Sequence, residues 1–163
     1  MKKCERESIL TDIFIKDIKN MEQVPRTTKS TEEEERLSRK ILFAEDNEDI
    51  RESLEQNFRL EGYEVEAVEN GQLLLDKLKA GEYDLIITDN DMPVLSGFKA
   101  LRQIRATESL KDLPVIFLSA RDDDPELLKI IKDELKASFM SKRSLSTQAL
   151  LDKIKNLLEG KKQ

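Results

Sequence analysis

Four of the short apolar runs in this sequence end in side chains that could do chemistry. Glu45 and Asp46 follow the first run, and Asp89 follows the third. Three carboxylates within ~5 Å would repel by a few kcal/mol per pair at an effective dielectric constant of ~20, so a cation must hold them together. Oxygen ligands without histidine or thiolate select Mg²⁺ or a similar ion. The hydroxyl of Ser119 and the ammonium group of Lys142, at the ends of the fourth and fifth runs, would then bind a transferred phosphoryl group.

The elements that must position these residues alternate between strand-like runs and segments of helical period. Strands are predicted at 40–44, 63–68, 85–88, 115–119 and 139–141, and helices at 48–60, 71–80, 97–107, 125–136 and 147–159. This alternation predicts an α/β fold with a doubly wound parallel sheet. The carboxyl ends of the strands then meet at one edge, where open sheets of this kind place their functional crevice.

The composition excludes several classes of protein. The chain has no histidine, which excludes histidine-based metal sites, Ser-His and Cys-His nucleophiles, and a phosphohistidine of its own. Cys4 is the only cysteine, which favours a reducing, cytoplasmic compartment. No apolar stretch approaches the ~18 residues of a membrane span. Residues 41–163 hold 18 basic against 25 acidic side chains, which argues against direct DNA binding.

Four sequence blocks together resemble the receiver domain of two-component response regulators. They begin at ILFAEDNEDIRESLEQNFRLEGYEVEAVENG and continue through DLIITDNDMPVLSGFKALRQIR, PVIFLSARDDD and SFMSK, so the resemblance covers about residues 40–159 in order. It implies a flavodoxin-like (βα)5 fold with strand order 2-1-3-4-5. We therefore expect a receiver domain at 40–161, preceded by an extension at 1–39.

The resemblance also implies a role for each acidic position. Asp89 would be the nucleophile that accepts the phosphoryl group, giving an aspartyl phosphate. Asp46 would bind Mg²⁺ directly, and Glu45 would bind it through a coordinated water. Asp91 would offer its backbone carbonyl, and Asp89 would itself contact the metal.

Three further positions would carry the signal away from the aspartyl phosphate. Lys142 would pair with the phosphoryl oxygens, and Ser119 would turn inward to hydrogen-bond one of them. Phe139 matches the aromatic position whose rotamer reports that movement to the surface of the fourth helix, fifth strand and fifth helix. The response would be a shift between two packings of the same domain.

Three departures from the family pattern change these expectations locally. Arg143 follows Lys142 where the family usually has proline, often in a cis bond that costs ~3 kcal/mol for other residues, so a different loop path is expected. The chain reads ELKASF where a Gly-Ala turn is usual, which predicts a different end to the fourth helix. Asp91 and Arg121 flank the path of hydrolytic water, where a charged pair would change the lifetime of the phosphate.

Two other functions fit parts of the sequence. A degenerate receiver would act as a binding module without phosphorylation. All five key side-chain types are retained, which argues against it, but the change at Arg143 leaves it open. A haloacid-dehalogenase-type phosphatase would share an aspartyl-phosphate intermediate, but that family places its D-x-D motif after the first strand, with Thr or Val at the fifth position. Here the motif follows the third strand and the fifth residue is Pro93. We therefore expect a signalling domain and not an enzyme.

The N-terminal extension has a helical period over residues 9–21 and a polar linker over 25–36. Such a helix would dock on its own domain, or would instead mediate homodimerisation or partner binding. Only GKKQ follows Glu159, so we expect a stand-alone regulator without an output domain. It would take its phosphoryl group from a sensor histidine kinase or a histidine phosphotransfer protein and would act on a downstream target protein.

Overall fold

Five parallel strands form the centre of the fold, in the order β2-β1-β3-β4-β5. The structure is a computed structural model that describes residues 39–160. The strands are β1 (Lys40–Ala44), β2 (Glu64–Val68), β3 (Leu85–Asp89), β4 (Val115–Ser119) and β5 (Ser138–Ser141). This confirms the predicted flavodoxin-like α/β fold. The extension at 1–38, with its predicted helix and most of its linker, lies outside the described residues.

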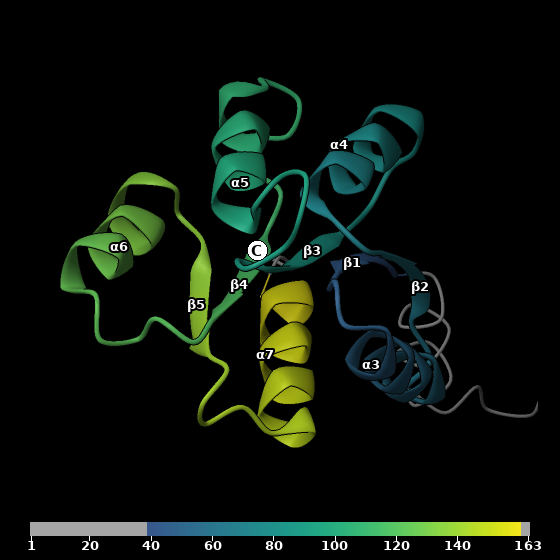
Figure 1. Ribbon diagram of the computed structural model, residues 1–163. Coiled ribbons are helices and arrows are strands. Elements are labelled where there is room, and N and C mark those ends of the chain that lie inside the picture. Colours follow the sequence, from purple (N-terminus) through teal and green to yellow (C-terminus); the bar gives the residue numbers. More distant parts are fainter. Residues whose placement is uncertain (1–38, 161–163) are drawn as a thin grey trace, which may run out of the picture. The chain divides into compact units, whose positions relative to one another are not determined.

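Helices cover both faces of the sheet (Figure 1). They are α3 (Glu48–Leu60), α4 (Gly71–Ala80), α5 (Gly97–Ala106), α6 (Pro125–Lys129) and α7 (Thr147–Glu159). Figure 1 shows α4 and α5 on one side of the sheet and α3 and α7 on the other, with α6 near the β5 edge. No helix in the described part of the chain is long and apolar enough to cross a membrane.

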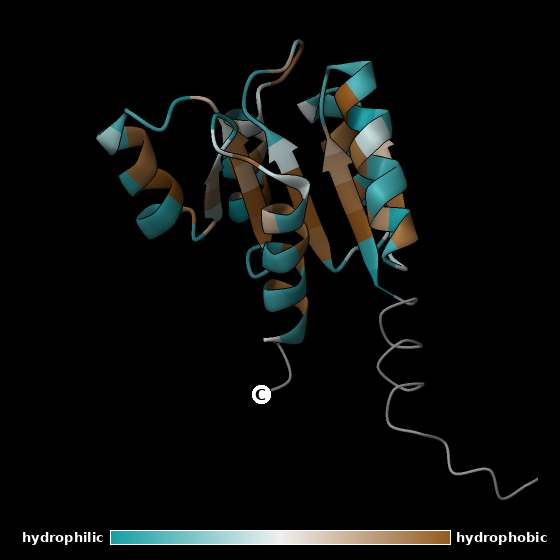
Figure 2. Ribbon diagram, turned by 90° about the horizontal axis from the view of Figure 1, so that it is seen from below, coloured by the Kyte–Doolittle hydropathy of each residue, from teal (hydrophilic) through white to brown (hydrophobic). Residues whose placement is uncertain are grey.

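Each strand contributes to two hydrophobic cores because successive side chains point to opposite faces. Ile41 and Phe43 pack with α3 and α7, whereas Leu42 and Ala44 pack with α4 and α5. The three central strands β1, β3 and β4 are buried almost throughout, as expected for a parallel sheet covered on both sides. Figure 2 shows the strands mainly in the hydrophobic colour, while the helices carry both colours.

Side chains that cap the N-termini of the helices fix the path of the loops at the carboxyl ends of the strands. The side chain of Asn47 accepts a hydrogen bond from Ile50 N at the start of α3, and Ser96 does the same for Lys99 N at the start of α5. Asp124 accepts from Leu127 N at α6, where Pro125 occupies the first turn. These caps hold the loops that carry the candidate site residues.

The predicted helix at 125–136 is wrong at its C-terminal end. Helix α6 ends at Lys129 and is followed directly by a π-helical segment, η2 (Ile130–Glu134). Beyond this segment, Lys136 has a left-handed φ of 48°. Arg105 Nε donates to Leu135 O at 2.6 Å, and Arg105 Nη1 donates to Leu113 O at 2.9 Å. Arg105 thereby satisfies a carbonyl that the end of the helix leaves open. The expectation that this end differs from the usual family pattern stays a prediction.

Lys136→Gly is expected to stabilise the domain by about 1 kcal/mol, because a side chain at positive φ is strained and glycine is not. Denaturant unfolding of the full chain measures the change. Lys129→Gly is the matched control: Lys129 has an ordinary helical φ of −63°, so glycine there should destabilise by about 1 kcal/mol. Equal losses in both variants would contradict a strained Lys136.

Candidate metal and phosphoacceptor site

Three carboxylates converge where β1 and β3 end. Ala44 lies opposite Thr88 in the register of the two strands, so Glu45 and Asp89, the next residues, reach the same level. Ligand oxygens of Glu45, Asp46 and Asp89 all lie within 4.8 Å of one another. Glu45 and Asp89 are 1% and 2% exposed, whereas Asp46 is open to solvent. Such a set of hard anionic oxygens, accessible on one side, fits Mg²⁺.

Lys142 reaches this cluster from the end of β5, which β4 separates from β3. It follows β5, so its side chain crosses the end of β4 to bring Nζ within 2.9 Å of Glu45 Oε2 and 3.2 Å of Asp89 Oδ2. Its backbone N–H donates to Ser119 O at 2.9 Å, which fixes the loop after β5. A single ammonium group therefore bridges the two buried carboxylates.

The environment shifts the pKa of both charged partners. Burial, and secondly the charge of Glu45, raise the pKa of Asp89 from 3.8 to about 6, although Lys142 opposes the rise. Burial alone would lower the pKa of Lys142, but its hydrogen bond to Glu45 and the charge of Asp89 outweigh burial and raise it. At neutral pH the site thus holds a charged lysine and a carboxylate that is costly to keep ionised without a cation.

Without metal, the free energy of unfolding is expected to increase as the pH falls from 7 to 5, by about 1 kcal/mol. Folded Asp89, with a pKa of about 6, takes up a proton in this range, whereas the unfolded chain with a value near 3.8 does not. Denaturant unfolding at pH 5, 6 and 7 tests this. Saturating Mg²⁺ should abolish the increase, since a bound cation keeps Asp89 ionised. A metal-free stability that falls over this range would contradict the shift.

The other expected site residues lie near the cluster but are not all directed at it. Ser119 is fully buried at the end of β4, and its Oγ accepts the backbone N–H of Arg121 at 3.1 Å. Phe139 is half-buried against the core on the α4 and α5 face, opposite Phe117 in the β4–β5 register. The side chain of Asp91 is exposed. Among the described residues, no hydrogen bond joins Ser119 to Asp89.

Sequence reasoning missed a residue that determines where Asp89 lies. A Cβ atom on Gly97 would lie 2.0 Å from Asp89 O and 2.9 Å from Thr88 Oγ1. Gly97 N also donates to Asn90 O at 3.1 Å, and Asn90 N donates to Asp89 Oδ1 at 2.9 Å. The start of α5 is therefore packed directly on the backbone of the candidate nucleophile. A glycine following the N-cap serine of the predicted helix was the only available signal.

A second overlooked residue, Arg51, supports the acidic loop after β1. Its Nη1 donates to Glu45 O at 2.8 Å and to Asp46 O at 3.2 Å. The backbone N–H of Asn47 donates to Glu45 Oε1 at 3.3 Å. These contacts hold the two acidic side chains in place from the backbone side, and no short motif in the sequence indicated them.

The loop after β5 follows a trans path. The described chain contains no cis peptide bond, so the bond between Lys142 and Arg143 is trans. Lys142 Nζ nevertheless reaches the carboxylates, which means that the missing proline does not displace the lysine. The expected change of loop path therefore leaves the charge pairing of the cluster intact.

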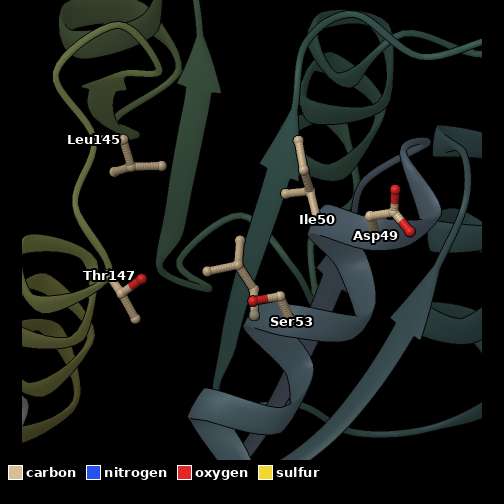
Figure 3. Close-up of a pocket in the computed structure, with 6 residues that line it drawn as sticks. Asp49, Ile50, Ser53, Leu145 and Thr147 are labelled. Carbon is tan, nitrogen blue, oxygen red and sulfur yellow. The ribbon is translucent and has the colours of Figure 1, made fainter.

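A groove lies beside the acidic cluster, between the start of α3 and the start of α7 (Figure 3). Asp49, Ile50 and Ser53 line one wall, and Leu145 and Thr147 face them from the other segment. Ile50 is 40% exposed and offers apolar surface in this groove. A macromolecule that approached Asp89 from this side would cover apolar surface.

The sequence of this chain is similar to those of known proteins. The family model that describes the response regulator receiver domain matches residues 41–155. The chain is 36% identical over 118 residues to the uncharacterized transcriptional regulatory protein YkoG of Bacillus subtilis, a stretch that makes up 72% of this chain and 50% of YkoG. It is 37% identical over 90 residues to the response regulator MprA of Mycobacterium tuberculosis, or 55% of this chain and 38% of MprA. The matched stretch thus spans half or less of the length of these two relatives.

Solved structures agree with this match. The signal receiver domain of a histidine kinase from Syntrophus aciditrophicus superimposes with a TM-score of 0.69 at 30% identity, covering 77% of this chain and 94% of that one. The response regulator TrrA of Thermotoga maritima, solved in complex with Mg(2+)-BeF, gives 0.62 at 34% identity, covering 74% and 99%. With five strands in the receiver order and a carboxylate cluster at their carboxyl ends, this chain belongs to the response regulator receiver domains of two-component signalling.

Proposed function

We propose that this protein accepts a phosphoryl group on Asp89 in a Mg²⁺-dependent reaction. The observation that carries the proposal is the bridge of Lys142 Nζ between Glu45 and Asp89 inside a group of three carboxylates. In the transfer, an oxygen of Asp89 forms the new P–O bond while the P–N bond of a phosphohistidine breaks. Lys142 then balances the negative charge gained at Asp89.

The metal would be held by the acidic cluster. Asp46, which is exposed, and Asp89 are proposed as direct ligands, Glu45 as a ligand through water, and Asp91 through its backbone carbonyl. When bound, Mg²⁺ offsets the charge of the carboxylates and of the incoming phosphoryl group. Burial, and secondly the charge of Glu45, raise the pKa of Asp89, so a bound cation would favour its ionised form.

The switch would run through Ser119 and Phe139. Ser119 is the last residue of β4, and its side chain is buried at the carboxyl end of the sheet. Its hydroxyl would turn to donate a hydrogen bond to a phosphoryl oxygen. Phe139 is proposed to change rotamer in response, and so to alter the surface formed by α6, β5 and α7. Its half-buried position on β5, opposite Phe117, is compatible with two packings.

The proposed partners are a sensor histidine kinase or a histidine phosphotransfer protein as donor, and a downstream target protein. The groove at Ile50 supports a protein donor, because a partner that reaches Asp89 from that side would bury it. Direct DNA contact is not part of the proposal, since acidic residues dominate after residue 40. We also propose an extension at 1–39 followed by a receiver domain at 40–161. Homodimerisation and a cytoplasmic location are proposals as well.

Two alternatives are distinguished by the same site. A degenerate receiver would not require the lysine bridge, and the contacts of Lys142 argue against it. A haloacid-dehalogenase-type phosphatase would turn over organic phosphates, whereas a receiver only assists its own phosphorylation and dephosphorylation. We therefore propose a signalling domain and not an enzyme.

Intact-mass analysis with acetyl phosphate tests the proposal. One phosphoryl group should add to the full chain when Mg²⁺ is present, and none should add when the metal is chelated. Beryllofluoride binding that depends on Mg²⁺ is the second readout. A chain that neither labels nor binds beryllofluoride would support the degenerate receiver, and steady release of phosphate from many organic phosphates would support the phosphatase.

A further inference from the structure

Arg143, the residue after Lys142, contacts the loop that follows β4. Its Nη1 lies 2.9 Å from Asp122 Oδ1, and its Nη2 lies 3.9 Å from Asp123 Oδ2. These contacts join the loop at 120–124 to the loop after β5. Both loops border the carboxylate cluster, because the first begins at Ser119 and the second carries Lys142.

Asp122 is held from two directions. Ser141 Oγ donates a hydrogen bond to Asp122 Oδ2, and the Arg143 guanidinium lies against Oδ1. The residues on either side of Lys142 in the sequence therefore both bind the same carboxylate. The hydrogen bond from Ser141, together with the charge of Arg143, lowers the pKa of Asp122, so the carboxylate stays ionised at neutral pH.

The same loop holds the Ser119 hydroxyl in its observed position. Ser119 Oγ accepts the backbone N–H of Arg121, which is the residue directly before Asp122. Asp124, two residues after Asp122, caps α6 through Leu127 N. A turn of Ser119 toward Asp89 must therefore break or move a hydrogen bond to a short segment that is anchored at both ends.

We infer that Arg143 is a positioning residue whose ion pair with Asp122 stabilises the loop conformation in which Ser119 is turned to Arg121. The inference rests on the proposed function, because it concerns the movement of Ser119 toward a phosphoryl group on Asp89. The ion pair opposes this movement. The side chains of Arg143 and Asp122 are 59% and 31% exposed, so the effect on binding of a phosphoryl mimic should be about threefold.

The test measures the affinity of the full chain for beryllofluoride at saturating Mg²⁺. Arg143→Ala and Asp122→Asn should each raise the affinity about threefold, and the double variant should bind no more tightly than either single variant. A purely long-range electrostatic effect predicts changes of opposite sign in the two variants, because removing a positive charge weakens anion binding and removing a negative charge strengthens it. Opposite changes in the two single variants would therefore overturn the inference.

Controls separate positioning from a general loss of structure. Arg143→Lys keeps the charge and should bind beryllofluoride nearly as wild type does. Arg59→Ala removes an equally exposed arginine, 58% against 59%, from an ion pair with Glu55 on α3 and should leave the affinity unchanged. Affinity for Mg²⁺ alone should not change in Arg143→Ala, since the carboxylate cluster lies on β1 and β3 and not on this loop.

A second measurement needs no ligand. In metal-free protein, the backbone amides of residues 120–124 should exchange with solvent several-fold faster in Arg143→Ala than in wild type, and equally fast in Asp122→Asn. Unchanged exchange together with unchanged beryllofluoride affinity would overturn the role of Arg143. A wild-type chain that does not bind beryllofluoride at all would instead contradict the proposed function, while the exchange experiment would still test the ion pair.

Discussion

Asp89→Asn is expected to reduce labelling by acetyl phosphate at least ~100-fold, because an amide cannot serve as the carboxylate nucleophile. Mass spectrometry of the intact chain, with and without hydroxylamine, measures the aspartyl phosphate. The same substitution should stabilise the metal-free protein by about 3 kcal/mol at pH 7, since it removes a buried charge whose pKa is raised to about 6. Loss of labelling together with gain of stability cannot result from unfolding.

Asp76→Asn is the matched control for the loss of one carboxylate. Asp76 lies on α4 and is 51% exposed, and its two contacts, a hydrogen bond from Gln72 and an i,i+3 ion pair with Lys79, are both at the surface. Its replacement should change neither labelling nor stability by a measurable amount. If Asp89→Asn labelled as well as wild type, another residue would be the nucleophile and the assignment of Asp89 would be wrong.

Gly97→Ala is expected to destabilise the protein by about 3 kcal/mol or more, which is a large effect for the addition of one methyl group. The new Cβ would lie 2.0 Å from Asp89 O, and backbone atoms cannot yield as a flexible side chain can. Either α5 or the end of β3 must move. Denaturant unfolding measures the loss, and the affinity for Mg²⁺ should fall with it because Asp89 belongs to the carboxylate cluster.

Gly81→Ala provides the comparison at a position with room. A Cβ on Gly81 would meet its nearest atoms, of Tyr83, at 3.6 Å, which is ordinary van der Waals contact. This substitution should change stability by less than about 1 kcal/mol. Similar stabilities for Gly97→Ala and Gly81→Ala would show that the contact between α5 and Asp89 is not tight.

The periodicity of the sequence was sufficient to predict most of the fold. Runs such as 41–44 and 115–118 are apolar throughout, and only a strand covered on both faces buries every residue of such a run. The structure confirms all five predicted strands. It also confirms the order of the strands in the sheet, which the family resemblance had implied. The end of the fourth helix was predicted wrongly, because the contacts of Arg105 with Leu135 and Lys136 depend on residues about thirty positions apart.

The sequence by itself determined which residue types follow each strand, and a parallel sheet necessarily gathers those residues at one edge. It therefore indicated Glu45, Asp46 and Asp89 as one cluster. Only the tertiary structure decided that Lys142 crosses the end of β4 to bridge two of them, and that Arg143 pairs with Asp122. The physical reason is that strand length and hydrophobic period fix where a residue lies along the sheet, whereas the direction of a long charged side chain depends on neighbours from distant parts of the chain.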